Sequence, residues 1–487
     1  MAEPKNSGPT RREMVRGLAA GLGLLASGCA SSPGAEPAPR TAAAPPGAAR
    51  PGRPRHPSVL FVSIDDLNDW TGGLGGHPQV RTPHLDGLAA RGRSFTRAFC
   101  SASLCNPSRS SLLTGLAPTT LGLFDNTTNF RSLRPAAQTL PQCFAAAGYR
   151  TVGIGKIFHN SFPDSISWQE EYPFASFRDR RLKQRPLTPL TIRPEAADTD
   201  LERRFDFGPV PFADEELADG KVLAQALSVL ASAGPEPLFL GVGFARTHIP
   251  WYVPERYFEL YPLESVALPE LRPDDLDDVG PLARDWVERQ RISDDLDRPE
   301  IARRAVRAYL AAVSFVDALV GRLLEAWWAS PHGREGLVVL WSDHGFHHGQ
   351  KRHWRKETPW REGTRVPLLL AAPWLPSPGV PCNQPVSLLD LYPTLAELAG
   401  LEAPRDLDGR SLLAQLEEPS APRERPAVMS WRPGSAAVVA EYHRLIRYQD
   451  GFVELYDHRE DPREWVNVAG RPENRARVAE LSRFLPG

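Results

Sequence analysis

Residues 58–66 read SVLFVSIDD, an apolar run from Val59 to Ile64 that ends in two aspartates. A strand buried on both faces of a parallel sheet has this character, because none of its positions faces water. Two later stretches, PLFLGVGF at 237–244 and GLVVLWSDHG at 336–345, are of the same kind. The sequence therefore predicts three buried strands of one parallel sheet.

A helical repeat alternates with these strand-like runs. Apolar residues between 301 and 329 recur at steps of three, four or seven, which keeps them on one helix face. They are Val306, Leu310, Val313, Val320, Leu324 and Trp327. Alternating strands and helices predict an α/β fold, with a mostly parallel sheet between layers of helices. Residues 161–213 show no clear period, so we expect loops there.

The chain changes character near its C-terminus. Residues 402–427 are polar and rich in proline, which is typical of a domain boundary. Short strand-like runs follow, and then the helical run RARVAELSRFL at 475–485. We therefore expect a large α/β domain at 57–415 and a smaller domain at 416–487, the latter with an antiparallel sheet and a C-terminal helix.

The N-terminal residues have the composition of an export signal, 1–29, and a linker, 30–56. Arg11 and Arg12 precede an apolar stretch that is too short to span a bilayer, as in a twin-arginine signal. The sequence ASGC, ending at Cys29, resembles a bacterial lipobox, and simple cleavage nearby is the alternative. The linker is rich in proline and alanine and is typical of a tether. This segment predicts an exported bacterial protein of the periplasm or cell envelope, whose only membrane contact is a lipid anchor at Cys29.

The charge and the cysteine content exclude two classes of protein. The formal net charge is −2 and the pI about 6.7, so no overall positive potential would attract nucleic acid. Five cysteines are too few and too scattered for a disulfide framework, and we expect at most one bridge.

Acidic residues follow two of the predicted strands. Asp65 and Asp66 end the first strand, and Asp343 with His344 ends the third. In parallel α/β sheets, ligands bind beyond the carboxyl ends of the strands. An aspartate after a strand often only caps a turn. Three carboxylates and an imidazole at one sheet edge, however, are suitable ligands for Ca²⁺ or Mg²⁺.

The stretch SLCNPSRSSLLTG, residues 103–115, contains the pattern C-x-P-x-R from Cys105 to Arg109. With this motif, the chain resembles a type I sulfatase from about residue 57 to its C-terminus. The resemblance implies an alkaline-phosphatase-like fold. It also implies that a formylglycine-generating enzyme oxidises Cys105 to formylglycine, the alternative being a buried structural cysteine. Further stretches similar to the family lie at 390–401 and 454–469.

The resemblance implies a mechanism and a role for each matching residue. One hydroxyl of the hydrated aldehyde at position 105 attacks the sulfate ester, and the second then loses a proton and expels sulfate. The implied ligands of a Ca²⁺ ion are Asp65, Asp66, the modified Cys105, Asp343 and His344. The implied nucleophile is the modified Cys105. Arg109, Lys156 and His159 are implied to hold or deprotonate the formylglycine. His248 and Lys356 are implied to contact the sulfate.

The Asp-His pair at 343–344 also resembles the iduronate-2-sulfatase branch, whereas many sulfatases have asparagine as the second residue. The implied substrate is a sulfated saccharide or another sulfated small molecule. The loop at 347–353 departs from this branch, so the substrate stays open. Four histidines between 344 and 353 could suggest zinc, but their spacing is not that of a usual zinc site.

Two other functions are alternatives to sulfate ester hydrolysis. The first is a phosphate or phosphonate ester hydrolase of the alkaline phosphatase superfamily; the motif Cys105–Arg109 argues against the members with two zinc ions but not against those with formylglycine. The second is a surface-anchored binding lipoprotein with an inactive site. That function predicts a lost nucleophile or ligand, and none is lost.

Overall fold

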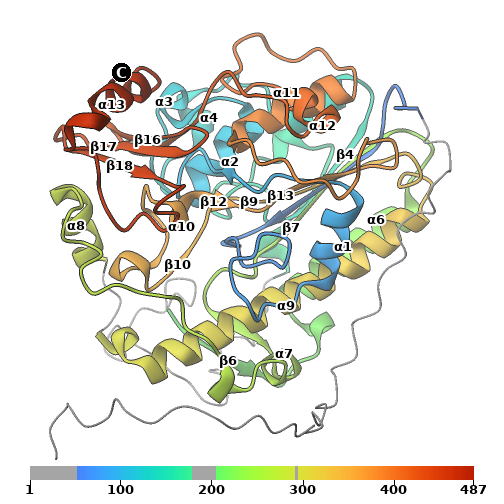
Figure 1. Ribbon diagram of the computed structural model, residues 1–487. Coiled ribbons are helices and arrows are strands. Elements are labelled where there is room, and N and C mark those ends of the chain that lie inside the picture. The colour runs from blue at the N-terminus through green and yellow to red at the C-terminus, as the bar shows by residue number, and fades with distance from the viewer. Residues whose placement is uncertain (1–51, 178–204, 291–293, 487) are drawn as a thin grey trace, which may run out of the picture. The chain divides into compact units, whose positions relative to one another are not determined.

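The computed structural model describes residues 52–177, 205–290 and 294–486 (Figure 1). Its main sheet has seven strands in the order β2-β13-β9-β1-β7-β4-β5. The strands are β1 (Val59–Ile64), β2 (Arg93–Ser94), β4 (Arg150–Gly155), β5 (Glu170–Pro173), β7 (Leu238–Phe244), β9 (Leu337–Ser342) and β13 (Leu368–Ala371). The signal segment 1–29 and the linker as far as residue 51 lie outside the described residues.

The three strands expected from the sequence are β9, β1 and β7, which lie side by side in the middle of the sheet. Both neighbours pair with β1 in parallel, and only β13 runs against the other strands. Successive side chains of a strand point to opposite faces. Accordingly, Leu60 and Val62 belong to one hydrophobic core, and Val59 and Phe61 belong to the other. The predicted α/β fold with a mostly parallel sheet is confirmed.

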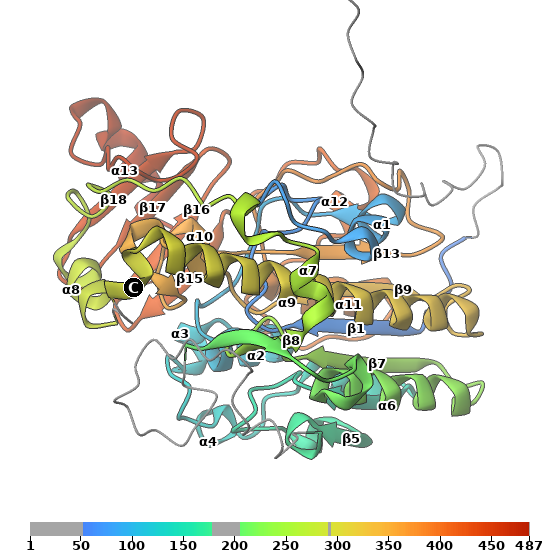
Figure 2. The same ribbon diagram turned by 90° about the horizontal axis from the view of Figure 1, so that it is seen from below.

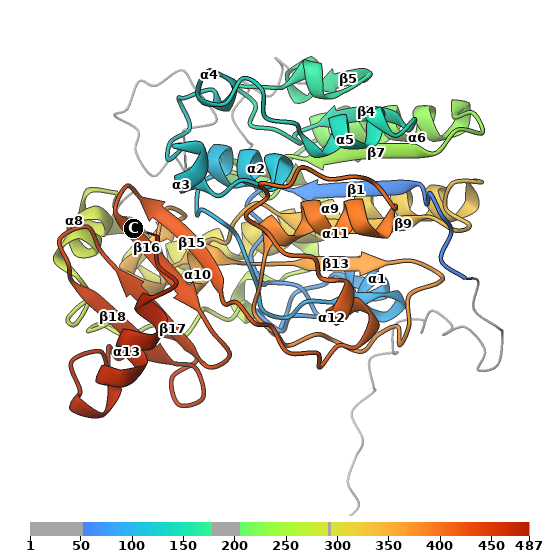
Figure 3. The same cartoon turned by 90° about the horizontal axis from the view of Figure 1, so that it is seen from above.

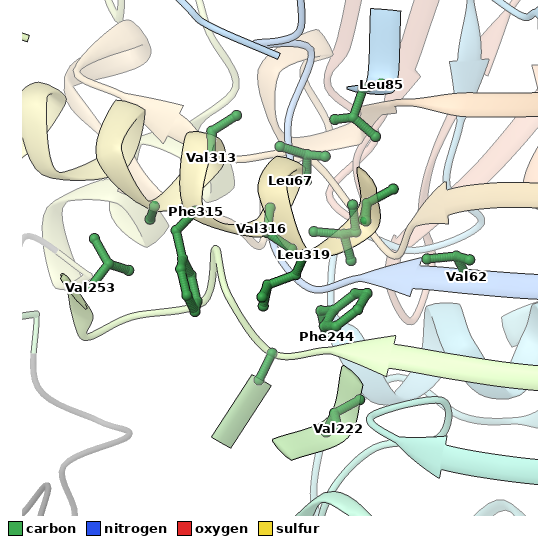
Figure 4. Packing of buried hydrophobic residues seen from close by; sticks show 14 of the residues in the cluster. Val62, Leu67, Leu85, Val222, Phe244, Val253, Val313, Phe315, Val316 and Leu319 are labelled. Atoms are coloured by element: carbon green, nitrogen blue, oxygen red, sulfur yellow. The ribbon is translucent and has the colours of Figure 1, made fainter. Parts of the chain in front are cut away.

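Helices cover both faces of this sheet (Figures 2 and 3). One face carries α1 (Pro83–Arg91), α6 (Ala218–Ser232) and α9 (Pro299–Ala329), and the other carries α2 (Cys105–Thr114), α5 (Leu140–Ala146) and α11 (Leu391–Leu398). All six apolar positions predicted for the long helix are buried in α9. In Figure 4, Leu319 of this helix lies next to Phe244 at the end of β7. Burial of such a side chain contributes about 1.5–3 kcal/mol.

The shorter helices are α3 (Pro118–Leu121), α4 (Phe130–Leu133), α7 (Glu255–Glu259), α8 (Pro281–Arg289), α10 (Arg361–Thr364), α12 (Leu413–Glu417) and α13 (Arg475–Ser482). No helix in the described ranges combines the length and the hydropathy that a membrane span requires.

The four described cysteines, Cys100, Cys105, Cys143 and Cys382, are all free thiols.

Short strands form three further pairings around the main sheet. They are β3 (Ala98–Phe99) between β12 (Arg365–Val366) and β14 (Val386–Ser387); β6 (Phe207–Val210) with β8 (Trp251–Pro254); and β10 (His347–His348) with β11 (Trp354–Arg355). The expectation of loops throughout 161–213 is wrong, because β5 and β6 lie within this range. Both strands have only four residues, and such a length shows no periodic pattern.

The C-terminal sheet is antiparallel, as predicted, and α13 follows it. Its strands are β15 (Ala427–Arg432), β16 (Ser435–Val439), β17 (His443–Arg447) and β18 (Val453–Asp457). Figure 3 shows this sheet beyond the end of β1. A parallel bridge joins Ala102 to Ser430, so β15 runs beside the segment that leads to Cys105. The domain boundary at residue 415 stays a prediction.

Candidate active site

Cys105 is the first residue of α2, and Leu104 before it is extended. Pro107 stands in the first turn of the helix, where its missing N–H breaks no intrahelical bond. The helix ends at Gly115, which adopts a left-handed conformation with φ of 70°. The Cys105 side chain is buried, with 1% of its surface exposed. The motif therefore fixes a thiol inside the protein rather than at its surface.

Arg109 lies one helical turn after Cys105 and is fully buried. Its Nε donates to Asp343 Oδ2 at 2.9 Å, and an Nη donates to Asp65 Oδ1 at 3.0 Å. The other Nη donates to the Lys156 carbonyl at 2.6 Å. Burial opposes the charge of Arg109, but Asp343 and Asp65 hold its pKa above the ordinary range. The guanidinium thus joins the start of α2 to the ends of three strands, β1, β4 and β9.

The two aspartates after β1 face different partners. Asp65 accepts from Arg109 and forms an ion pair with Lys156. Asp66 adopts a left-handed conformation, with φ of 59°, and its backbone N–H donates to Asp343 Oδ1 at 3.1 Å. Asp66 Oδ2 is buried and has no hydrogen-bond partner among the described residues. This carboxylate therefore has a free oxygen atom inside a water-excluded site.

Lys356 and His344 surround the Cys105 thiol. Lys356 Nζ is 3.1 Å from Cys105 Sγ and 2.6 Å from Asp66 Oδ1. His344 Nε2 is 3.2 Å from the same sulfur, while Nδ1–H donates to the Gly345 carbonyl at 3.0 Å. Donation from Nδ1 leaves Nε2 directed at the site, with a free lone pair only when the ring is neutral. Burial lowers the pKa of His344, but Asp343 outweighs burial and raises it to about 9.

Four of the side chains described above lie close enough together to hold a metal ion. Ligand atoms of Asp66, Cys105, Asp343 and His344 all lie within 4.8 Å of one another. The raised pKa of His344 and the free oxygen of Asp66 both indicate that this group attracts positive charge. Two carboxylates and an imidazole fit a divalent cation, which would replace the charge of a proton on His344.

The remaining sequence-predicted residues lie around this group. Lys156 follows β4, and burial opposes its charge while Asp65 outweighs that effect and raises its pKa. His248 has a ligand atom within 4.8 Å of those of Asp65 and Asp66, and its Nδ1–H donates to the Ile249 carbonyl at 2.6 Å. His159 makes no hydrogen bond to Cys105 within the described ranges. Burial first, and then the charge of Lys156, lower the pKa of His159 to about 3.

Tyr309 is a site residue that the sequence did not reveal. Its hydroxyl donates to the Asp66 carbonyl at 2.9 Å and accepts from the Asn68 N–H at 2.9 Å. These bonds hold the turn that gives Asp66 its left-handed conformation. The only signal in the sequence was a polar hydroxyl inside the apolar stripe of α9.

The histidines after His344 lie in the β10–β11 hairpin and contact other protein groups. His347 hydrogen-bonds to Thr358 Oγ1 at 2.6 Å, and His348 stacks on Trp70 with ring centroids 4.1 Å apart. His353 Nε2–H donates to the Lys356 carbonyl at 2.8 Å. None of these three histidines belongs to a metal-ligating group in the described part of the chain.

His353 makes the stability of the protein depend on pH. Burial lowers its pKa from 6.5 to about 4 in the folded protein. As the pH falls below about 6.5, the unfolded chain binds a proton at His353 while the folded protein does not. The stability due to the neutral ring is therefore present above pH 6.5 and is lost as the pH falls towards 4. At pH 5 the expected loss is roughly 2 kcal/mol.

Urea denaturation at pH 7 and pH 5 checks this prediction. The His353→Gln variant keeps a donor for the Lys356 carbonyl but cannot titrate in this range. Its free energy of unfolding should decrease less than that of the unsubstituted protein between the two pH values. An equal decrease in both proteins would contradict the prediction.

This chain matches family models and relatives that are sulfatases or sulphohydrolases. The Sulfatase family model matches residues 57–401, and the model of the N-sulphoglucosamine sulphohydrolase C-terminal region matches 349–486. A sulfatase of Formosa agariphila is 34% identical over 448 residues, covering 88% of this chain and 86% of its own. The iduronate 2-sulfatase of Mus musculus is 31% identical over 396 residues, covering 71% of this chain and 69% of its own.

Solved structures with a similar fold include a hydrolase of another ester. The structure of a phosphonate monoester hydrolase of Agrobacterium radiobacter superimposes with a TM-score of 0.74 at 22% identity, covering 88% of this chain and 94% of its own. Such a likeness concerns the fold, whereas the family model covers most of the chain, from the first strand to the end of α11. This protein therefore belongs to the sulfatase family and is a sulfuric ester hydrolase.

Proposed function

We propose that this sulfatase cleaves sulfate esters of saccharides, with a formylglycine derived from Cys105 as nucleophile and with Ca²⁺ in its acidic cluster, which consists of Asp65, Asp66 and Asp343. The main support is the environment of Cys105 Sγ, which has Lys356 Nζ at 3.1 Å and His344 Nε2 at 3.2 Å. A structural cysteine packs against apolar groups, whereas this one is in contact with a cation and an imidazole. The intact C-x-P-x-R motif supports the same function.

The proposed calcium ligands are Asp65, Asp66, Asp343 and His344, together with the modified Cys105. Both oxygens of Asp65 already accept from Arg109 or Lys156, but a carboxylate oxygen has a second lone pair that can bind a cation. Bound calcium would supply positive charge that neutralises the carboxylates and polarises a sulfate oxygen. Formylglycine would supply a hydrated aldehyde, whose second hydroxyl makes a separate hydrolysis of an enzyme ester unnecessary.

The positive side chains are suited to hold the sulfate group. Burial opposes the charge of Lys356, but Asp66 keeps its pKa above the ordinary range, so it stays an ammonium at neutral pH. Lys156 is held in the same way by Asp65. Charge-assisted bonds from these two groups would position a sulfate ester against residue 105. Arg109, which has no free access to solvent, would instead fix the start of α2.

Two neutral imidazoles are available to move protons. Burial first lowers the pKa of both His159 and His248 to about 3, so each ring is neutral at pH 7. A neutral His159 can accept a proton from the residue at position 105. In His248 the donating Nδ1–H leaves Nε2 as an acceptor, which must gain a proton before it can protonate a leaving alcohol. The negative charge of a bound sulfate would favour that protonation.

A side-by-side assay tests the reaction and the nucleophile. The protein is produced together with a formylglycine-generating enzyme, and the peptide that contains Cys105 is examined by mass spectrometry. The same preparation is assayed with 4-nitrophenyl sulfate, 4-nitrophenyl phosphate and a phenylphosphonate ester. We expect formylglycine at position 105 and the highest kcat/KM for the sulfate. A higher kcat/KM for the phosphonate ester, or full activity with an unmodified thiol, would contradict the proposal.

Removal of calcium should affect both activity and stability. Metal analysis of active protein is expected to show about one calcium per chain, bound through hard oxygen ligands. A ligand at 100 times its Kd stabilises the folded state by about 2.7 kcal/mol, so EGTA should lower Tm as well as turnover. The Asp343→Asn variant should lose this response, whereas Glu417→Gln, at an exposed position of α12, should keep it. Recovery with zinc but not with calcium would contradict the assignment.

We also propose that the protein is exported and tethered to a membrane through a lipid on Cys29. The support is the sequence alone: paired arginines, a short apolar core and a lipobox-like ASGC. Labelling with radioactive palmitate should mark the unsubstituted chain and leave Cys29→Ala unmarked. Equal labelling of both chains would contradict the anchor.

A further inference from the structure

Arg432, the last residue of β15, is an exposed cation that the fold holds in one orientation. Its guanidinium carbon lies 3.7 Å from the ring centroid of Trp286 and 5.4 Å from that of Trp431. Within the described ranges it makes no hydrogen bond and no ion pair. A guanidinium stacked on indole rings loses rotamer freedom, while its N–H groups stay available at its edge.

An unpaired carboxylate lies on the neighbouring loop. Glu357 is half-buried and adopts a left-handed conformation, with φ of 67°. Its backbone is fixed, because its N–H donates to the Ser103 carbonyl at 2.9 Å and its carbonyl accepts from Trp431 Nε1 at 2.6 Å. Its carboxylate makes no hydrogen bond or ion pair with any described residue. Burial raises the pKa of this carboxyl, and the charges of Lys356, Arg355 and Arg432 act against that rise.

Both groups lie beside the proposed active site. Glu357 directly follows Lys356, the residue whose ammonium contacts the Cys105 sulfur. The parallel bridge between Ala102 and Ser430 brings β15, two residues before Arg432, beside the segment that leads to Cys105. The hydrogen bond from Trp431 to the Glu357 carbonyl joins the end of β15 to the residue after Lys356. Arg432, at the end of β15, therefore lies close to the segments that carry Cys105 and Lys356.

We propose that Arg432, stacked on Trp286, binds a second anionic group of the saccharide substrate, such as a uronate carboxylate or another sulfate. Glu357 accepts hydrogen bonds from the hydroxyls of the same sugar ring. This inference rests on the proposed function, and it adds a substrate class: saccharides that carry at least one negative charge besides the sulfate that is removed.

The chemistry of the two groups supports this assignment. Arginine binds carboxylate and sulfate through two parallel N–H···O bonds, and such bonds are stronger than neutral ones. An arginine with a purely structural role forms an ion pair with a carboxylate, as Arg444 does with Glu464 at 2.6 Å in the same part of the protein. Arg432 is held in one orientation by Trp286, but it has no carboxylate partner among the described residues. The Glu357 carboxylate can only accept hydrogen bonds when ionised, which suits sugar hydroxyls.

The test compares substrates that differ by one anionic group. The first pair is 4-methylumbelliferyl iduronide 2-sulfate and the same compound with its carboxylate reduced to an alcohol. The second pair is glucosamine 2-N,6-O-disulfate and N-acetylglucosamine 6-sulfate. The Arg432→Gln variant should raise KM for the dianionic member of one pair by roughly 10-fold to 100-fold, with kcat nearly unchanged. The pair that responds identifies the group as a carboxylate or a sulfate.

Two further variants make the outcome decisive. Arg432→Lys keeps the charge but loses the planar fork, so it should restore only part of the affinity. Arg459→Gln is the matched control, since Arg459 is also stacked on an aromatic ring, at 5.2 Å from Tyr442, but is paired with Asp457. It should leave every KM unchanged.

Two results would overturn the inference: equal effects of Arg432→Gln on both members of each pair, or no effect on any substrate. The proposed function fails separately, if the unsubstituted protein, with formylglycine at position 105, hydrolyses none of the four sulfate esters.

Discussion

Replacement of Cys105 by alanine is expected to lower the turnover of 4-nitrophenyl sulfate by at least about 10⁴-fold, the size of effect seen when a nucleophile is removed from an enzyme. The reason is that Lys356 and His344 both contact the Cys105 sulfur, and no other described cysteine has such neighbours. The measurement is kcat/KM for purified protein, with a thermal unfolding curve to show that the variant is folded.

A second substitution at the same position separates the nucleophile from its modification. Cys105→Ser keeps a hydroxyl that can be sulfated but has no second hydroxyl to expel the sulfate. It should release about one equivalent of 4-nitrophenol per chain and then stop, as a covalently trapped enzyme does. The control is Cys100→Ala, which removes a buried thiol outside the site. Steady turnover by Cys105→Ala within tenfold of the unsubstituted protein would contradict the assignment.

Replacement of Arg109 by glutamine should have the largest effect on stability. It removes the cation that pairs with the buried carboxylates of both Asp65 and Asp343, and the loss of one partner of a buried ion pair costs about 3–5 kcal/mol. Urea denaturation measures the free energy of unfolding. Activity should be lost as well, because Arg109 joins α2 to the strand ends that carry the acidic cluster.

The matched control is Arg477→Gln, which removes a surface pair with Glu480 on α13. Surface pairs contribute only about 0–1 kcal/mol, so this variant should unfold at nearly the same urea concentration as the unsubstituted protein. A loss of less than about 1 kcal/mol for Arg109→Gln would show that the two carboxylates find other partners.

The sequence predicted the centre of the fold because local patterns determine it. The strands β1, β7 and β9 are buried on both faces, so they are apolar throughout and their ends are easily seen. Side chains at the ends of neighbouring parallel strands must meet, which is why Asp65, Asp66 and Asp343 could be grouped. The motif from Cys105 to Arg109 led, through its resemblance to type I sulfatases, to the proposal that residue 105 is the nucleophile.

The remaining features depend on contacts between distant residues. The hydrogen bond from Tyr309 to the Asp66 carbonyl joins residues 243 positions apart, and no local pattern marks either partner. Arg432 and Trp286 are ordinary surface-type residues until α8 and β15 bring them together. The strands β5 and β6 were missed because four residues are too few to show a period. The role of a residue that depends on contacts with residues distant in the sequence can be predicted only with a structure.

The burial of Cys105 has a consequence for the life of the nascent chain. A second enzyme cannot reach a thiol with 1% of its surface exposed, so the proposed oxidation must come before the site closes. Closure needs Lys356, which is made 251 residues after Cys105. At roughly 5–20 residues per second, the ribosome takes about 10–50 s to add that length. The distance between Cys105 and Lys356 along the chain thus limits the time during which Cys105 can be oxidised. A variant that is translated faster or folds more rapidly would yield a larger fraction of chains that are folded but inactive.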